Sequence, residues 1–446
     1  MSLTKKTIQG ITFNLLKVLF AFCINIFIAK IFSDPVPFGL ILYALSIIDF
    51  SAVIVSFGMN GALVRYSKEH FNEETFKEYI DSTLFFILYL QFIWLVVLLV
   101  WPDFWSEVLF QRSQTDLVQF VAFYTSLRVL RQLIFSTHWG MNDFFSRGIT
   151  DFLPSFVNFI ILLFTLIFSD KIENKIFVIT SSFIVSEIIS LIILNEHFNR
   201  NYSFRFLNLR RIFNSKLKFN TSFKKNLKFG FHTLLGALIL TGMSLIDRFS
   251  INSTLTQATL GKYLTIYSLC SYLLIVVSVL SNVLLSNFID KWKHESHSVV
   301  NKINNTFYLV NLIIFIFGLI LFSIIEPLIT FLYGTVYLGL EYLIPYLIIG
   351  ILFQAFYMIY GNLSTLSEKP QITTYSLIPG IIIKFFGNFL LIKLLGIDAI
   401  VFVNIIAFCA VGITLILLLN SNKIRIGFKP FASTFFYCII FLLLTH

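Results

Sequence analysis

The stretch TLLGALILTGMSLIDRFSINSTL, residues 233–255, is long and apolar enough to cross a lipid bilayer as a helix. It nevertheless carries two adjacent charges, Asp247 and Arg248. A charged side chain at the centre of a span costs about 2.5–3.5 kcal/mol on insertion scales. Neighbouring residues on a helix point about 100° apart, so the two charges are not each other's main partner. Each therefore needs a separate partner: another helix, water in a cavity, or a charged substrate.

The rest of the chain is equally apolar. Of its 446 residues, 57% are hydrophobic and only 13% are charged, and the mean hydropathy is +0.85. A soluble domain has about 25% charged residues, so the sequence predicts an all-α integral membrane protein. About twelve transmembrane helices are expected, and a short 13th apolar segment follows at 431–445. The expected spans are 11–33, 38–60, 82–101, 117–136, 150–169, 174–194, 229–251, 261–286, 304–326, 342–363, 375–394 and 398–420.

The basic residues are distributed unevenly between the expected loops. With the N-terminus inside, 24 of the 33 Lys and Arg residues fall at cytoplasmic positions, including Arg128 to Arg147 and Lys291 to Lys302. Five fall outside: Arg112, Lys171, Lys175, Lys262 and Lys393. The positive-inside rule therefore predicts a cytoplasmic N-terminus. The net charge of +10 is a topology signal and does not indicate nucleic-acid binding. The nine cations from Arg200 to Lys228 would also contact anionic lipid headgroups.

One long hydrophilic connection, 195–228, divides the chain into an N-terminal six-helix lobe (1–194) and a C-terminal six-helix lobe (229–420). A basic segment and the short apolar tail, 421–446, follow. The two halves look related, because FGLILYALS (38–46) is similar to LGKYLTIYS (260–268), with Gly39 and Gly261 at equivalent places. Two like-oriented repeats of this kind commonly enclose a central substrate path.

Polar side chains inside the spans are the candidate site residues. Asn14, Lys17 and Asn25 share one stripe of the first span, so Lys17 is expected to line a cavity, whereas Lys30 is expected to reach the outer headgroups. Intramembrane charges are functional candidates by default, with a structural pair between helices as the alternative. The remaining candidates are Asp49, Glu187, Asp247, Arg248 and Lys384.

Several function classes find no support. The string HESH (294–297) lacks zinc-ligand spacing and a third ligand. No P-loop is present, so the energy for transport would come from an ion gradient or from the substrate's own potential. The four cysteines lie inside apolar segments and imply no disulfide framework.

Residues 28–69 resemble the opening of a Wzx-type polysaccharide (O-antigen) flippase of the MOP exporter superfamily. The similarity rests on Ile28-Ala29-Lys30, Phe38-Gly39, Tyr43, Phe57-Gly58 and Ala62-Leu63-Val64-Arg65-Tyr66. In the second half it rests on Asp247-Arg248 followed by Leu260-Gly261-Lys262-Tyr263, on Phe331 to Tyr337, and on Asn388 with Gly396.

This resemblance implies two six-helix bundles in a V-shaped, MATE-like fold that works by alternating access. It implies a flippase, not an enzyme, that moves an undecaprenyl-pyrophosphate-linked oligosaccharide between leaflets of the bacterial inner membrane. Lys17, Arg248 and Lys384, with Asn14 and Asn25, would bind the substrate. Asp49, Glu187 and Asp247 would be coupling candidates for H+ or Na+, with no cofactor and no metal. A polysaccharide polymerase and a chain-length regulator are the protein partners expected.

Two alternatives remain open. A MATE-like cation or drug antiporter has the same fold, but its cavity should be net acidic, whereas these spans hold at least as many cations as acids. A membrane polysaccharide polymerase or ligase needs a large outer loop, and the expected outer loop 102–116 is short.

Overall fold

The computed structural model describes residues 3–67, 73–141, 143–168, 174–214, 221–367 and 369–445, and these are helical apart from short connections. The prediction of an all-α membrane protein is confirmed. The helices are α1 (Leu3–Phe32), α2 (Pro35–Ser56), α3 (Met59–Tyr66), α4 (Glu73–Val100), α5 (Pro102–Phe110), α6 (Thr115–Gly140), α7 (Phe144–Ile167), α8 (Lys175–Tyr202), α9 (Leu209–Asn214), α10 (Thr221–Thr254), α11 (Gln257–Leu332), α12 (Ile344–Leu366), α13 (Gln371–Leu395), α14 (Asp398–Ser421) and α15 (Lys429–Thr445). Two 3₁₀ turns, Thr335–Tyr337 and Glu341–Leu343, precede α12.

Ten segments of the described chain are long and apolar enough to cross a membrane. The two other expected spans, 117–136 and 261–286, fall in α6 and in the first part of α11. The 13th apolar segment forms α15, which has 17 residues. A span needs about 20 residues, so α15 is short for a full crossing.

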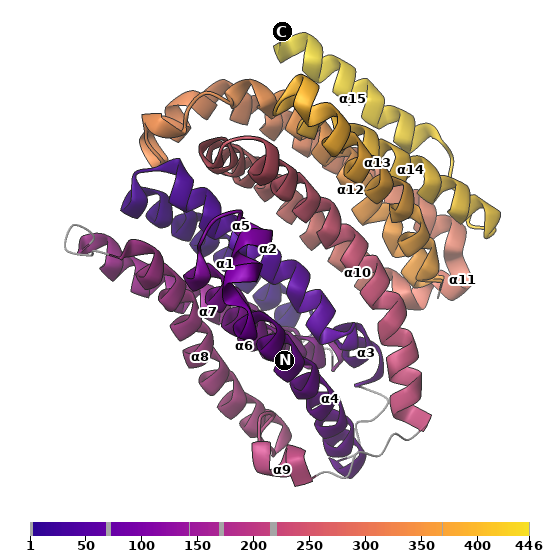
Figure 1. Ribbon diagram of the computed structural model, residues 1–446. Coiled ribbons are helices and arrows are strands. Elements are labelled where there is room, and N and C mark those ends of the chain that lie inside the picture. Colours follow the sequence, from indigo (N-terminus) through magenta and orange to yellow (C-terminus); the bar gives the residue numbers. More distant parts are fainter. Residues whose placement is uncertain are drawn as a thin grey trace. The chain divides into compact units, whose positions relative to one another are not determined.

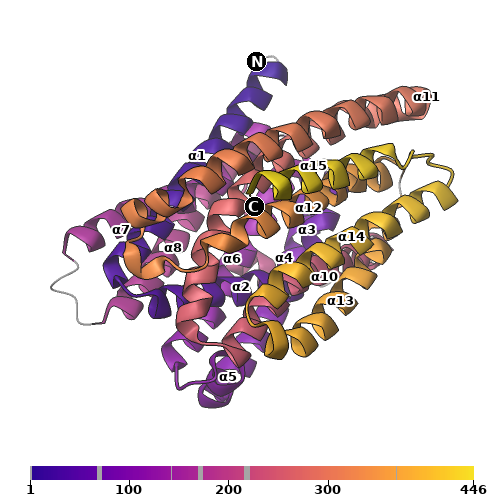
Figure 2. The ribbon, with the colours of Figure 1, turned by 90° about the horizontal axis from the view of Figure 1, so that it is seen from above.

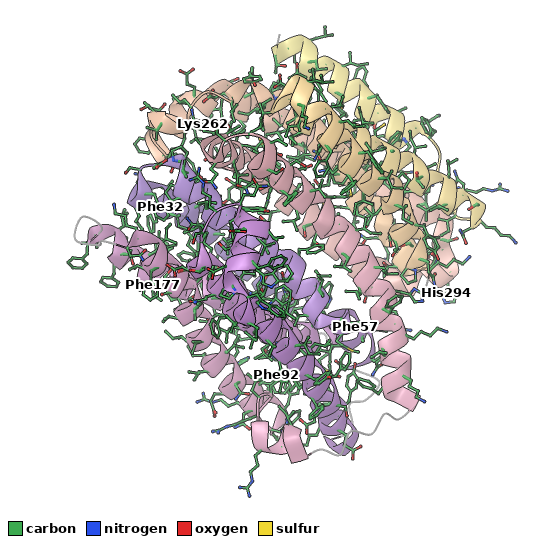
Figure 3. The ribbon with its side chains drawn as sticks, in the orientation of Figure 1. Phe32, Phe57, Phe92, Phe177, Lys262 and His294 are labelled. Carbon is green, nitrogen blue, oxygen red and sulfur yellow. The ribbon has the colours of Figure 1, made fainter. Side chains whose placement is uncertain are left out.

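One connection that the sequence predicted as a loop between two spans is helical in the structure. The basic stretch Lys291 to Lys302 was expected as a loop, but it is helical on both sides of a kink at Glu295 (φ −135°, ψ 41°), within α11. Figure 3 labels His294 beside this bend. The kink divides α11 into two helices that meet inside this stretch, although the stretch contains no glycine or proline.

The hydrophilic connection 195–228 is also largely folded. Helix α8 continues to Tyr202, and Phe204 and Phe206 after it are buried in a core with α4. Asn195 pairs with the backbone of Leu207, accepting from its N–H at 2.7 Å and donating to its carbonyl at 3.2 Å. Residues 215–220 of this connection lie outside the described residues, as does Lys171, which was expected outside the membrane.

The described helices form two compact units. Unit 1 comprises Met1–Phe32 and Leu40–Leu238, and unit 2 comprises Ser33–Gly39 and Ile239–His446. In unit 1, α7 packs against α1 and α8, and α6 packs against α8 (Figure 1). In unit 2, α14 packs against α12 and α13, and α15 lies along α11 and α12 (Figure 2).

Each unit contains a close glycine crossing. In unit 2, a Cβ added to Gly39 would lie 2.7 Å from the backbone nitrogen of Gly261, so α2 and α11 approach at a distance that only glycine permits. In unit 1, Gly58 (φ +68°) separates α2 from α3 and contacts Gly230. Gly39 and Gly261, the glycines at equivalent places of the two sequence halves, thus contact each other through their backbones.

Candidate functional site

A chain of ion pairs joins four helices of unit 1. Lys17 on α1 donates to Asp151 Oδ2 on α7 at 2.5 Å. The other oxygen of Asp151 accepts from Arg131 on α6 at 3.4 Å. Arg131 Nε in turn donates to Glu187 Oε1 on α8 at 2.5 Å. These contacts link α1, α7, α6 and α8 at the depth of the apolar segments.

A second pair lies beside this chain. Arg128 lies three residues before Arg131 on α6, so the two arginines share one face of the helix. Arg128 forms an ion pair with Asp49 on α2. We call Lys17, Asp49, Arg128, Arg131, Asp151 and Glu187 the unit 1 charge cluster. It contains three cations and three carboxylates, so its formal charges cancel.

The cluster has a buried part and an accessible part. The Glu187 side chain is 0% exposed, and Arg131 is nearly as buried. Lys17, in contrast, is 39% exposed and Asp49 is 47% exposed. A charged side chain that is accessible at membrane depth faces water, since contact with lipid tails is too costly. Lys17 and the Asp49–Arg128 pair therefore lie on a wet surface, whereas Arg131–Glu187 is part of the core.

Unit 2 holds a buried triad. Lys384 on α13 forms an ion pair with Asp247 on α10 and donates to the carbonyl of Met243 at 3.3 Å. Asn388 donates to the second oxygen of Asp247 at 2.8 Å. Lys384 and Asn388 are four residues apart on α13, so one face of that helix carries both donors. Met243 and Asp247 are four residues apart on α10, so one face of that helix carries both acceptors. The Lys384 side chain is only 2% exposed.

Arg248 has a different environment from its neighbour Asp247. It is half-buried, and its guanidinium carbon lies 5.6 Å from the ring centroid of Tyr267 on α11. Arg248 takes part in none of the salt bridges found among the described residues. It is a half-buried cation in the apolar stretch of α10, with an aromatic ring beside it and, among the described residues, no carboxylate in a salt bridge with it.

The structure thus gives a partner to each predicted acid. Asp49, Glu187 and Asp247 contact Arg128, Arg131 and Lys384 respectively. Among the predicted substrate-binding residues, Lys17 belongs to unit 1, together with the half-buried Asn14 and Asn25, whereas Arg248 and Lys384 belong to unit 2. The assignment of these residues to substrate or coupling ion stays a prediction.

The sequence reading missed three residues of the unit 1 charge cluster. Arg128 and Arg131 were expected at cytoplasmic positions, but they lie in the body of α6, and Arg131 is buried. Asp151 was not considered, although it lies in the second turn of α7. The spacing of three between the two arginines inside an apolar stretch was an available signal. Arg147 lies nearby, its guanidinium 3.9 Å from the Trp139 ring.

Over the described ranges, no group of three or more His, Cys, Asp and Glu side chains could hold a metal ion.

The family profile described as "Polysaccharide biosynthesis protein" matches residues 3–284. No curated protein sequence matches the chain.

Solved membrane transporters share its fold. The lipid II flippase MurJ, in an inward closed conformation, gives a TM-score of 0.71 at 16% identity, covering 99% of this chain and 92% of MurJ. An inward-facing multidrug resistance MATE family transporter gives a TM-score of 0.66 at 13% identity, covering 94% and 99%. A MOP superfamily transporter from Pyrococcus furiosus gives 0.66 at 12% identity, covering 94% and 96%. The predicted MOP/MATE-like fold is confirmed.

Proposed function

The chain belongs to the polysaccharide biosynthesis protein family, and we propose that it is a flippase for undecaprenyl-pyrophosphate-linked oligosaccharide. The cargo would be an O-antigen or capsule repeat unit, moved from the cytoplasmic to the periplasmic leaflet of a bacterial inner membrane by alternating access. The protein would be a transporter and not an enzyme. Its N-terminus would be cytoplasmic, and a polysaccharide polymerase and a chain-length regulator would be its partners.

The observation that carries this proposal is the unpaired charge of Arg248. A half-buried guanidinium at membrane depth is costly unless an anion neutralises it for part of the working cycle. The planar donor fork of arginine suits a pyrophosphate, which accepts two parallel hydrogen bonds. Tyr267 beside it offers an aromatic face of the kind on which sugar rings and guanidinium groups stack.

The charge balance favours an anionic cargo. The charges of the unit 1 charge cluster cancel, and in unit 2 Asp247 offsets Lys384, whereas Arg248 has no carboxylate partner among the salt bridges of the described residues. A cavity for a cationic drug needs the opposite balance. An inside-negative membrane potential would favour outward movement of the headgroup by about 2.3 kcal/mol per charge per 100 mV. No cofactor is needed, and Asp49, Glu187 and Asp247 remain the candidates for coupling to H+ or Na+.

Substitution of Arg248 tests the proposal. Arg248→Gln should abolish glycan export in cells while the protein stays folded in the membrane, because the side chain anchors no carboxylate. Arg248→Lys should retain part of the export, since it keeps the charge but loses the fork. Arg425→Gln, which removes an exposed cation after α14, is the matched control and should leave export unchanged. Normal export by a folded Arg248→Gln variant would exclude this residue as the headgroup site.

A further inference from the structure

In the unit 1 charge cluster, two carboxylates form ion pairs with cations on a water-accessible surface. Asp151 holds Lys17, and Asp49 holds Arg128. Both cations are partly accessible, and Asp49 is more exposed than the arginine it neutralises. One member of each pair is well exposed, and an ion pair that reaches solvent is weaker than a fully buried one, so either cation can exchange its carboxylate for another anion.

We propose that Asp49 and Asp151 are internal substitutes for the phosphate groups of the substrate. Each carboxylate neutralises an accessible cation while the transporter is empty, and each gives up that cation when the anionic headgroup of a lipid-linked pyrophosphate binds. This inference rests on the proposed function and adds to it a pair of positioning residues that set the affinity for the headgroup.

Asp151 can release Lys17 without becoming an unpaired charge. Its second oxygen already accepts from Arg131, at 3.4 Å, a distance that leaves room for a tighter bond. When a phosphate takes Lys17, Asp151 can move closer to Arg131 and remain paired. Asp49 needs no second cation when it releases Arg128, because water can hydrate its exposed carboxylate directly. The structure therefore offers each displaced acid a stable position.

Glu187 differs from the two exchangeable acids. Its side chain is 0% exposed and contacts Arg131, between the packed helices α6 and α8. Burial makes the loss of one partner expensive, so this pair does not exchange its carboxylate for the headgroup. Glu187 thus supplies an internal control within the same cluster.

The exchange would serve the empty return step of the cycle. A transporter that releases its anionic cargo outside must return with cations that no longer have a ligand. With Asp49 and Asp151 in place, the ion-paired groups of the cluster carry no net charge during that return. The membrane potential then neither assists nor opposes their movement.

The test is binding of inorganic pyrophosphate, and of undecaprenyl pyrophosphate, to the purified full-length protein in nanodiscs, measured by calorimetry at two salt concentrations. Asp49→Asn and Asp151→Asn should each tighten binding by about fivefold to tenfold, the size of a partly exposed ion-pair coupling. Glycan export per folded molecule should fall in the same variants, because the cations keep the cargo longer and return charged. Tighter binding with slower turnover separates this role from a merely structural one.

Two controls separate competition from other effects. Asp103→Asn makes the same charge change on the exposed surface of α5 and should leave binding unchanged. Glu187→Gln should lower thermal stability without tightening binding. If Asp151→Asn fails to fold, Asp49→Asn alone decides the question, since Asp49 is 47% exposed.

The outcomes against the proposal are distinct. Unchanged or weaker affinity in a folded Asp49→Asn variant, with wild-type protein binding pyrophosphate, overturns the exchange and leaves the proposed function standing. Loss of a pH or sodium dependence of export at unchanged affinity would make Asp49 a coupling site instead. Absence of pyrophosphate binding in the wild-type protein would remove the headgroup site and the exchange together.

Discussion

The buried pair of Asp247 with Lys384 gives the sharpest stability prediction. The carboxylate of Asp247 accepts from Lys384 with one oxygen and from Asn388 with the other. An asparagine at this position has a single acceptor oxygen, so whichever way its amide turns, its NH2 group meets one of these two donors. The change also leaves the ammonium of Lys384 buried without a counter-charge, and breaking one side of a buried pair costs about 3–5 kcal/mol.

Asp247→Asn should therefore lower the melting temperature of the purified protein by about 6 °C or more, at about 2–4 °C per kcal/mol for a unit of this size. The double change Asp247→Asn with Lys384→Met removes both charges at similar volume and should recover most of the loss, because replacing a whole buried pair is often neutral. Thermal unfolding in detergent, followed by tryptophan fluorescence, measures both, alongside protein abundance in the membrane.

The neighbouring Arg248 is the matched control. Arg248→Gln removes an adjacent charge that has no carboxylate partner, so its melting temperature should stay within about 2 °C of wild type while export is lost. The reasoning is refuted if Asp247→Asn is as stable and abundant as wild type. Should export by that variant also become independent of pH or sodium, Asp247 would be the coupling site.

Three further predictions concern other parts of the molecule. Lys17→Gln should reduce glycan export strongly with little loss of folded protein, whereas Lys30→Gln should matter less; equal losses would contradict the polar stripe of α1. Gly39→Ala should destabilise the protein by about 1–3 kcal/mol, because the new Cβ would lie 2.7 Å from a backbone nitrogen of α11; an unchanged melting temperature would show that the crossing can relax. In a cysteine-free background, an impermeant thiol reagent added outside should label Val336→Cys and not Ser215→Cys, and the reverse pattern would overturn the topology.

Much of the candidate site was predictable from single helices. Lys17, Asp49 and Glu187 stand out because a charge in an apolar stretch is costly wherever the helix is placed. The separate environments of Asp247 and Arg248 followed from the helical angle between neighbours. Arg128 and Arg131 were missed because they were counted among the cytoplasmic basic residues, although both lie within the expected span 117–136 and in the body of α6.

The sequence by itself determined the fold class, since apolar runs of this length can satisfy their backbone hydrogen bonds in a membrane only as helices. It also determined the superfamily, through motifs such as Asp247-Arg248 with Leu260-Gly261. Only the tertiary structure decided which charge neutralises which. Asp247 and Lys384 are 137 residues apart, and Lys17 and Asp151 are 134 apart. A helix specifies the direction of its own side chains, but the partner comes from a second helix whose position depends on the packing of the whole unit. Arg248 acquires its significance in the same way, because the carboxylate next to it in sequence is taken by a lysine on another helix.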